Sequence, residues 1–345
     1  MARVLLGMSG GVDSSVAAYL LKSDGYEVVG VTMTLFNQTD EEAARQTGDA
    51  KKVCDKLGIE HHVIDYKKEF KDIIIQDFVD NYLSGKTPNP CIKCNKYFKF
   101  GELWKKAQEL NCQYIATGHY ADIKDGNIYR IDSLKDQSYF LYQISKEVVP
   151  HILLPLNKYS NKDEIRNIAS REQLVEVAEK KDSQDICFIE EGNYAKFLED
   201  NLDNLPDQGN FVLTNGEVIG KHKGIIYYTI GQRKGLGISY KHPLYVVQID
   251  TKNNQVILGL EEDLYKKIVY VENTNLHVNE LPDNIFAKIR FKSELSPCTV
   301  EVIDDNNIKV TFDKKVKSPT PGQSLVLYSK EDMLLGGGII KYTEE

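Results

Sequence analysis

Short apolar runs alternate with stretches of helical periodicity over residues 1–130. The apolar runs predict strands at Arg3–Gly7, Glu27–Met33, His61–Asp65 and Tyr114–Thr117. The helical stretches are Ser14–Ser23, which follows two glycines, and Asp40–Leu57, which ends before Gly58. Because strands that alternate with helices form right-handed βαβ units, this pattern predicts an α/β domain with a mostly parallel sheet. Residues 138–200 then carry a mainly helical pattern.

The pattern changes near Leu205–Gly209, beyond which short β-rich runs are separated by Asn, Asp and Gly. A first group of runs is Phe211–Leu213, Ile225–Ile230, Tyr245–Ile249 and Val256–Leu258. A second group is Val269–Val271, Ala287–Phe291, Cys298–Ile303, Ile308–Phe312, Ser324–Tyr328 and Gly338–Tyr342. Six short strands in so short a segment indicate a small closed β-barrel. The chain therefore divides into an α/β domain (1–204), a small β-rich middle domain (205–268) and a C-terminal β-barrel (269–345).

The composition is that of an ordinary globular protein. Of 345 residues, 41% are hydrophobic and 27% are charged, which excludes collagen, low-complexity disorder and a disulfide-stapled miniprotein. No run of about 18 apolar residues occurs, so we expect no membrane-spanning segment. The first residues pass from a short apolar run directly into glycines, without the longer apolar region of a signal peptide. We therefore expect a cytoplasmic protein.

The charge is distributed unevenly. The formal net charge of −8 argues weakly against a nucleic-acid partner. However, Lys86–Lys106 holds six lysines and one glutamate, and Lys221–Lys241 holds five basic residues and no acid. A polyanion docks on such local basic segments, although solvated surfaces carry the same pattern. Charge alone leaves both interpretations open.

The residues Ser9–Ser15 read SGGVDSS and lie between a predicted strand and a predicted helix. A helix that begins after glycines presents its first N–H groups to an anion, and Gly10 and Gly11 leave room for phosphate oxygens. The serine hydroxyls can donate further hydrogen bonds, and Asp13 can ligate Mg²⁺. Since no GK[ST] follows, the loop is not a Walker A motif.

Two other function classes compete with a nucleotide enzyme. Gly7–Gly11 also matches G-x-S-x-G, the nucleophile elbow of α/β-hydrolases, but that elbow normally follows several strands and here follows the first. Such a hydrolase would need no ATP and would lose activity in a Ser9→Ala variant. A non-catalytic RNA-binding protein is the second alternative, and it would bind RNA without converting ATP to AMP.

Six cysteines are present, and only Cys91 and Cys94 are close in sequence. In a cytoplasmic chain such a pair is typical of a metal or redox site. We expect the nearby Lys93, Lys96 and Lys99 to lower the thiol pKa values. A zinc site would need further ligands, such as Cys112 or a histidine. Buried, inert thiols are expected at Cys54, Cys112 and Cys298.

Eight segments, in this order along nearly the whole chain, resemble the tRNA-specific 2-thiouridylases, a family of PP-loop ATP pyrophosphatases. They are SGGVDSS (9–15), TPNPxxxCNK (87–96), ATGHYA (116–121), KDQSYFLY (135–142), KDSxxICFI (181–189), YYTIGQRKGLGI (227–238), TPGQ (320–323) and LGGGII (335–340). The resemblance implies a PP-loop α/β fold and ATP-dependent 2-thiolation of the wobble uridine, position 34, in tRNAs for Lys, Glu and Gln. ATP adenylates the C2 oxygen, and sulfur transfer then releases AMP.

The resemblance also implies roles for individual residues. The ATP-binding set is Gly7, Met8, Ser9, Gly10, Gly11, Val12, Asp13, Ser14, Met33 and Gly118. The tRNA-binding set is Asn89, Pro90, Cys91, His119, Lys135, Asp136, Gln137, Arg290, Phe291 and Gln323. Cys94 matches the catalytic nucleophile and Cys187 the cysteine that carries a persulfide, while Asp13 is the expected catalytic acidic residue. The implied partners are the tRNA anticodon stem-loop, ATP with Mg²⁺, and a sulfur donor that is either a persulfide carrier protein or hydrosulfide.

One position departs from the family pattern. Cys91 stands where the familiar motif has an aspartate proposed to transfer protons. Three cysteines at 91, 94 and 187 instead resemble thiolation enzymes that hold a [4Fe–4S] cluster by three thiolates. A cluster and a persulfide relay give the same cysteines different tasks, and the sequence leaves both open.

Overall fold

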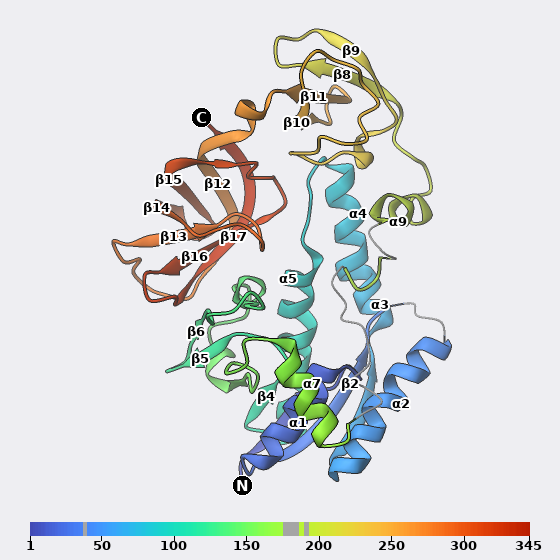
Figure 1. Cartoon of the computed structure of the whole chain (residues 1–345), viewed down its shortest axis with the longest axis vertical. Coiled ribbons are helices and arrows are strands. Elements are labelled where there is room, and N and C mark those ends of the chain that lie inside the picture. Colours follow the sequence, from blue (N-terminus) through green and yellow to red (C-terminus); the bar gives the residue numbers. More distant parts are fainter. Residues whose placement is uncertain (37–39, 175–185, 190–192) are drawn as a thin grey trace. The chain divides into compact units, whose positions relative to one another are not determined.

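The computed structural model describes residues 1–36, 40–174, 186–189 and 193–345. The chain forms two compact units (Figure 1). The first unit comprises Met1–Ile74, Cys91–Gln184 and Glu331–Leu334, and the second comprises Ile75–Pro90, Asp185–Lys330 and Leu335–Glu345. No helix among the described residues is long and apolar enough to cross a membrane.

A five-stranded parallel sheet forms the centre of the first unit. Its strand order is β3 (Glu60–Asp65), β2 (Glu27–Thr34), β1 (Arg3–Gly7), β4 (Tyr114–Ala116) and β7 (Ile152–Leu153). β1 is central, and its residues Val4, Leu5 and Leu6 are fully buried because helices cover both faces of such a sheet. The chain winds from β1 outward to β3 and then returns to β4 on the other side of β1. The predicted parallel α/β sheet is therefore confirmed.

Residues of three helices form one hydrophobic cluster with β1 and β2 of this sheet. α1 (Val12–Ser23) buries Val16, Ala17, Ala18 and Leu21 in a cluster with β1 and β2. α2 (Asp40–Leu57) and α7 (Lys162–Arg171) extend the same cluster. The prediction of a mainly helical segment over 138–200 is only partly right. Besides α7 and α9 (Tyr194–Asp200), the described part holds two short 3₁₀ turns, η3 (Ser138–Phe140) and η4 (Val149–His151), and residues 175–185 lie outside the described residues.

Two helical stretches contain π-helical turns that the sequence pattern did not indicate. The first runs through α3 (Lys67–Phe70), the π segment η1 (Lys71–Ile75) and α4 (Gln76–Leu83). The second runs through α5 (Pro90–Cys94), the π segment η2 (Asn95–Glu102) and α6 (Leu103–Glu109). Gly101 suits η2, since a Cβ there would lie 2.7 Å from the Lys96 carbonyl oxygen. π turns are rare and concentrate at functional sites.

The second unit holds two β-structures. The middle sheet has the order β10 (Tyr245–Asp250), β11 (Gln255–Gly259), β8 (Gly209–Leu213) and β9 (Val218–His222). The closed barrel has the order β12 (Tyr265–Leu276), β15 (Asn307–Lys317), β14 (Ser296–Asp304), β13 (Ile285–Lys288), β16 (Ser324–Ser329) and β17 (Leu334–Glu344). The predicted six-stranded barrel is confirmed. A small hairpin, β5 (Asp122–Lys124) with β6 (Asn127–Tyr129), belongs to the first unit.

Two elements of the middle domain differ from the sequence prediction. The run Ile225–Ile230 was expected to be a strand, but Ile225–Tyr227 forms the 3₁₀ turn η5. Ile225 and Ile226 are both buried, and consecutive side chains of a strand would point to opposite faces. β9 was not predicted because Val218 is exposed and the strand lacks a clear alternation of buried and exposed positions. A further 3₁₀ turn, η6 (Glu261–Leu264), leads into the barrel.

Candidate active site

The glycine-rich loop lies where the strand order of the sheet reverses. β1 ends at Gly7, and its neighbour β4 ends at Ala116, so the loops after these parallel strands meet at one edge of the sheet. In open α/β sheets this point is where ligands bind. Gly118 packs against the first turn of α1, since a Cβ there would lie 3.1 Å from the Asp13 Cβ atom. Two motifs more than 100 residues apart thus form one site.

Gly10 cannot be replaced without strain. Its φ of +68° lies in the left-handed region, and a Cβ would approach the Gln46 carbonyl oxygen to 2.6 Å. This glycine lets the loop turn tightly between β1 and α1. Val12 is buried and Met8 is 2% exposed, so these two residues present their backbone rather than their side chains.

The serine hydroxyls close the loop on itself. Ser14 Oγ donates to the Gly11 carbonyl at 3.1 Å and accepts from the Ser9 amide at 3.2 Å. Ser15 Oγ donates to the same Gly11 carbonyl at 2.9 Å. Ser9 Oγ contacts Ser14 Oγ at 3.1 Å, and no histidine among the described residues bonds it. The serine-hydrolase alternative therefore lacks its general base.

The start of the loop, at Met8, is held by the buried Thr32 hydroxyl, which in turn contacts a histidine. Thr32 Oγ1 donates to the Met8 carbonyl at 2.9 Å and lies 2.8 Å from His61 Nε2. Since the single hydroxyl proton goes to Met8, His61 must donate from Nε2. Burial lowers the pKa of His61, so the ring is neutral near pH 7. Met33 follows Thr32 at the end of β2 and is half-buried.

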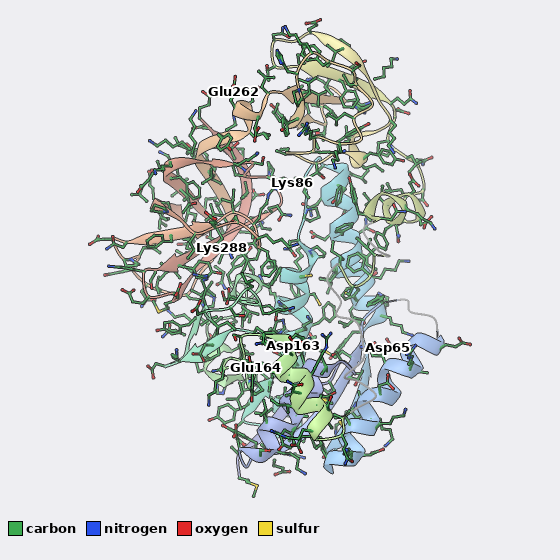
Figure 2. The ribbon with its side chains drawn as sticks, viewed as in Figure 1. Asp65, Lys86, Asp163, Glu164, Glu262 and Lys288 are labelled. Atoms are coloured by element: carbon green, nitrogen blue, oxygen red, sulfur yellow. The ribbon has the colours of Figure 1, made fainter. Side chains whose placement is uncertain are left out.

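Asp13 has two close partners in the first unit. Tyr120 donates its hydroxyl to Oδ1 at 2.7 Å, and Lys162 pairs with Oδ2 at 2.5 Å. Lys162 is the first residue of α7, next to Asp163 and Glu164 (Figure 2), and its side chain is 12% exposed. Sequence reasoning missed Lys162, which is 149 residues from Asp13. The start of α7 has a signal in the sequence, because asparagine is a favoured N-cap residue and the Asn161 side chain accepts a hydrogen bond from the Glu164 amide.

His119 is a buried, neutral histidine. It is 9% exposed, its Nδ1 lies 2.8 Å from Thr117 Oγ1, and its ring contacts Phe100 at 5.5 Å between centroids. Burial, with a smaller effect of the Lys99 ammonium, holds its pKa well below the usual value. His119 therefore carries no charge for a phosphate near neutral pH.

The cysteine pair lies on α5, one helical turn apart, so both thiols face the same side. Cys94 is 6% exposed, and burial raises the pKa of its thiol to about 11. Lys99 acts against this shift and Cys91 adds to it. Burial likewise raises the pKa of Cys91. The expectation that the lysines lower these pKa values is wrong for the net effect, because desolvation outweighs one cation.

Cys187 belongs to the second unit and is exposed. Its neighbour Phe188 packs against Phe78 of α4, with ring centroids 5.6 Å apart. Within the described part of the chain, no group of three or more His, Cys, Asp or Glu side chains is arranged to hold a metal ion. Cys54, Cys112 and Cys298 are buried, as predicted.

The segment Lys135–Gln137 is partly structural. Asp136 is 6% exposed and accepts hydrogen bonds from the Ser138 hydroxyl at 2.9 Å and the Ile131 amide at 3.2 Å. Gln137 pairs with the backbone of Tyr120 through its side-chain oxygen at 3.0 Å and its amide at 2.6 Å. These bonds fix the loop that carries the Tyr120 hydroxyl to Asp13.

The predicted tRNA-binding residues of the second unit make internal contacts. Arg290 donates from Nη2 to the Ser318 carbonyl at 2.8 Å and to Thr320 Oγ1 at 2.5 Å. The Phe291 ring lies 5.8 Å from the Lys288 ammonium, and Figure 2 labels Lys288 on the barrel. Gln323 donates to a backbone carbonyl of the segment that leads to Asn89 and Pro90. Direct RNA contacts of these residues stay predictions.

Three family models match the chain in sequence. They are described as the tRNA methyl transferase HUP domain at residues 2–191, the tRNA methyl transferase PRC-barrel domain at 195–260, and the aminomethyltransferase β-barrel domain at 266–340. They match the α/β, middle β and barrel architecture.

Curated relatives cover nearly the full length. A protein named tRNA-specific 2-thiouridylase MnmA from Clostridioides difficile is 44% identical, with 98% of each chain covered. One named tRNA-specific 2-thiouridylase MnmA 2 from Caldanaerobacter subterraneus is 46% identical, again with 98% of each chain covered.

Similar solved structures are more distant. A 4-thiouridine synthetase–RNA complex with bound ATP is 20% identical with a TM-score of 0.40, covering 58% of this chain and 50% of that chain. The U34-tRNA thiolase NcsA from Methanococcus maripaludis, with its [4Fe-4S] cluster, is 20% identical with a TM-score of 0.36, covering 58% and 66%.

Replacing Lys162 with methionine tests whether the ion pair between Lys162 and Asp13 contributes to ATP binding. The variant keeps most of the apolar stem and removes the ammonium. We expect ATP affinity, measured by calorimetry, to fall roughly tenfold to a hundredfold, as for a lost hydrogen bond between charged groups. Lys158→Met is the matched control, because Lys158 is exposed four residues earlier. Equal ATP affinity in both variants would contradict a role for Lys162 at the loop.

Alkylation of Cys94 tests the balance between burial and Lys99. With a pKa of about 11, the thiol is protonated at pH 7, so its reaction with iodoacetamide should accelerate as the pH rises through 9 to 11. Lys99→Met removes the cation that favours the thiolate, so the pKa should rise and the rate at a given pH should fall, about tenfold for each pKa unit. Mass spectrometry of the Cys94 peptide gives the rate. A faster reaction in Lys99→Met would contradict the inference that the Lys99 ammonium lowers the pKa of the Cys94 thiol.

Proposed function

This chain belongs to the family of the tRNA-specific 2-thiouridylases, and on that premise we propose that it thiolates C2 of the wobble uridine, position 34, in tRNAs for Lys, Glu and Gln. The observation that carries the proposal is the glycine loop at the point where the strand order reverses, with Gly118 packed against the first turn of α1. Such a loop binds the phosphates of a nucleotide through backbone N–H groups and the helix dipole.

The first step uses ATP to activate the base. The uridine C2 oxygen attacks the α-phosphorus, the bond to the β-phosphate breaks, and pyrophosphate leaves. Backbone groups of residues 7–14, with Met33 and Gly118 at the adenosine, form the proposed ATP site. Asp13 is the carboxylate of the loop that fits Mg²⁺, but Lys162 and Tyr120 share its oxygens. Asp13 would therefore ligate the metal only after Lys162 has turned to the phosphates.

The second step replaces oxygen by sulfur. Cys187 carries a sulfane sulfur from a persulfide carrier protein, and the Cys94 thiol attacks the inner sulfur. This forms a disulfide and frees hydrosulfide, which attacks C2 as AMP departs with the original oxygen. A thiol reductant then restores both cysteines. The exposure of Cys187 supports its role as acceptor from a carrier, and the burial of Cys94 supports a nucleophile kept away from other oxidants.

A [4Fe–4S] cluster would supply an alternative place for hydrosulfide to bind. It needs three thiolate ligands, and within the described part of the chain no group of three metal-ligating side chains is arranged to hold a metal ion. The described residues do not fit the cluster as they stand.

Charge supports an RNA substrate. The loop Arg233–Leu244 lines a cavity of about 480 Å³ and exposes Arg233, Lys234 and Lys241 without an acidic residue. Such residues would contact phosphates of the anticodon stem-loop, which position the RNA without reading its sequence. None of the six cysteines, all of which lie in the described part of the chain, forms a disulfide, as expected in the cytoplasm, where we place the reaction.

Product analysis tests the function. Incubation with unmodified tRNA, ATP and a persulfide donor should yield 2-thiouridine at position 34 with release of AMP and pyrophosphate. Asp13→Asn keeps the shape of the side chain but weakens its pair with Lys162, and we expect at least a roughly hundredfold loss of AMP formation. Nucleoside mass spectrometry and chromatography of the nucleotides give both readouts. Release of ADP and orthophosphate would sink the proposed adenylation.

Cys91→Asp separates the two sulfur routes, because it restores the familiar motif and removes one cluster ligand. We expect colourless, iron-free protein that thiolates within about threefold of the wild type, since a carboxylate can replace a thiol in proton transfer. Cys94→Ala and Cys187→Ala serve as control variants, and we expect both to lose thiolation activity. Iron analysis and thiolation rates of anaerobically purified protein decide the matter. If activity disappeared together with about four irons per chain, the cluster would be required.

A further inference from the structure

The segment Gly85–Pro90, here called the linker segment, joins α4 to α5 and leads directly into the cysteine pair. It makes backbone bonds with the barrel. The Thr87 amide donates to the Pro321 carbonyl at 2.9 Å, and Gln323 Nε2 donates to the Thr87 carbonyl at 2.8 Å. Both backbone polar groups of Thr87 are thereby satisfied by one turn of the barrel, Thr320–Gln323.

Gly322 is the point of closest approach. Its φ is +91°, and a Cβ there would lie 2.8 Å from the Thr87 nitrogen and 2.9 Å from the Lys86 Cβ atom. The turn is itself fixed on β17, because the Gly322 amide donates to the Ile340 carbonyl at 2.9 Å and the Ile340 amide donates to Gln323 at 2.8 Å. Only glycine satisfies both the backbone conformation and this contact.

The middle domain holds the other end of the linker segment. Gly85 has φ of +69°, and a Cβ would lie 2.9 Å from side-chain methyl groups of Ile249 and Thr251. Lys86, labelled in Figure 2 just beyond α4, forms an ion pair with Glu272 of β12 at 3.2 Å. Arg290 links the two β-domains, since the guanidinium that binds Thr320 also lies 3.5 Å from the Ile230 carbonyl.

We propose that the barrel turn Thr320–Gln323 is a positioning device for the cysteine helix, with Gly322 and Gln323 as positioning residues. The turn fixes Thr87, and the three residues after Thr87, two of them proline-restricted, lead to the start of α5. The inference rests on the proposed function and adds that the barrel governs the sulfur-transfer step. The ATP loop lies on β1 and α1, which the linker segment does not join, so a disturbed anchor should slow sulfur transfer more than adenylation.

Gly322→Ala disturbs the anchor, and Gly216→Ala is its matched control. Gly216 has nearly the same backbone angle, φ +90°, but a Cβ there would meet no atom within 4 Å. We expect Gly322→Ala to form thiouridine on the order of tenfold to a hundredfold more slowly, as for a catalytic group misplaced by about 1 Å. Water can then displace AMP from the adenylated C2 that sulfur does not reach, which restores the uridine, so AMP release should persist within about threefold of the wild type and more AMP is formed per thiouridine. Gly216→Ala should match the wild type in both quantities.

Hydrogen exchange gives a readout that does not depend on activity. The peptide containing Thr87 should exchange faster in Gly322→Ala and not in Gly216→Ala, since its amide loses the Pro321 acceptor. If Gly322→Ala fails to fold, Gln323→Glu replaces the donor to Thr87 by an acceptor and serves as the milder variant. It should raise the AMP to thiouridine ratio and also speed hydrogen exchange at Thr87, whereas a residue that only contacts RNA would leave exchange at Thr87 unchanged.

Three results would overturn the proposal: unchanged exchange at Thr87, an AMP to thiouridine ratio equal to that of the wild type, or equal effects in Gly322→Ala and Gly216→Ala. Failure of the proposed function is distinguishable from these. In that case the wild type itself would form no thiouridine, while hydrogen exchange would still report whether the barrel turn holds Thr87.

Discussion

The pairing of β1 with β4 is the constraint on which the first unit depends. It is the step at which the sheet reverses its winding, and it leaves the loops after both strands without a covering crossover. The consequence is chemical, since Gly118 has no side chain and can approach the start of α1, where the helix dipole is strongest. A residue with a Cβ at 118 would push Asp13 and Ser14 away from the loop they complete.

Electrostatics in this unit is governed by burial as much as by charge. Asp13 retains close donors from Tyr120 and Lys162, so its negative charge is compensated before any ligand arrives. The thiols of Cys91 and Cys94 and the ring of His119 are kept neutral mainly by desolvation. The Asp13–Lys162 pair, the two thiols and the His119 ring therefore contribute almost no net charge to the site.

Local pattern predicted the fold well and the electrostatics poorly. Strand and helix periodicity reflects which face is buried, and this was enough for the parallel sheet and for the six-stranded barrel. Two features could not be predicted from the sequence. The ion pair between Lys162 and Asp13 joins residues 149 positions apart. The π turns of η1 and η2 follow from packing and not from the periodicity of hydrophobic residues. The thiol pKa shifts had the wrong expected sign because the degree of burial of Cys94 cannot be read from the lysines beside it.

The bond between Gln323 and Thr87 spans 236 residues, and this separation has a consequence for synthesis. Domains emerge from the ribosome in order, so the N-terminal α/β elements can fold while the barrel is still unmade. Long-range contacts of this kind also form late, since the entropy of closing the loop must be overcome first. A nascent chain can thus complete its phosphate loop early, but the segment before the cysteine pair remains unanchored until residues 320–323 have been translated. Truncated chains would therefore lack the anchor of the sulfur-handling helix even when their nucleotide loop is formed.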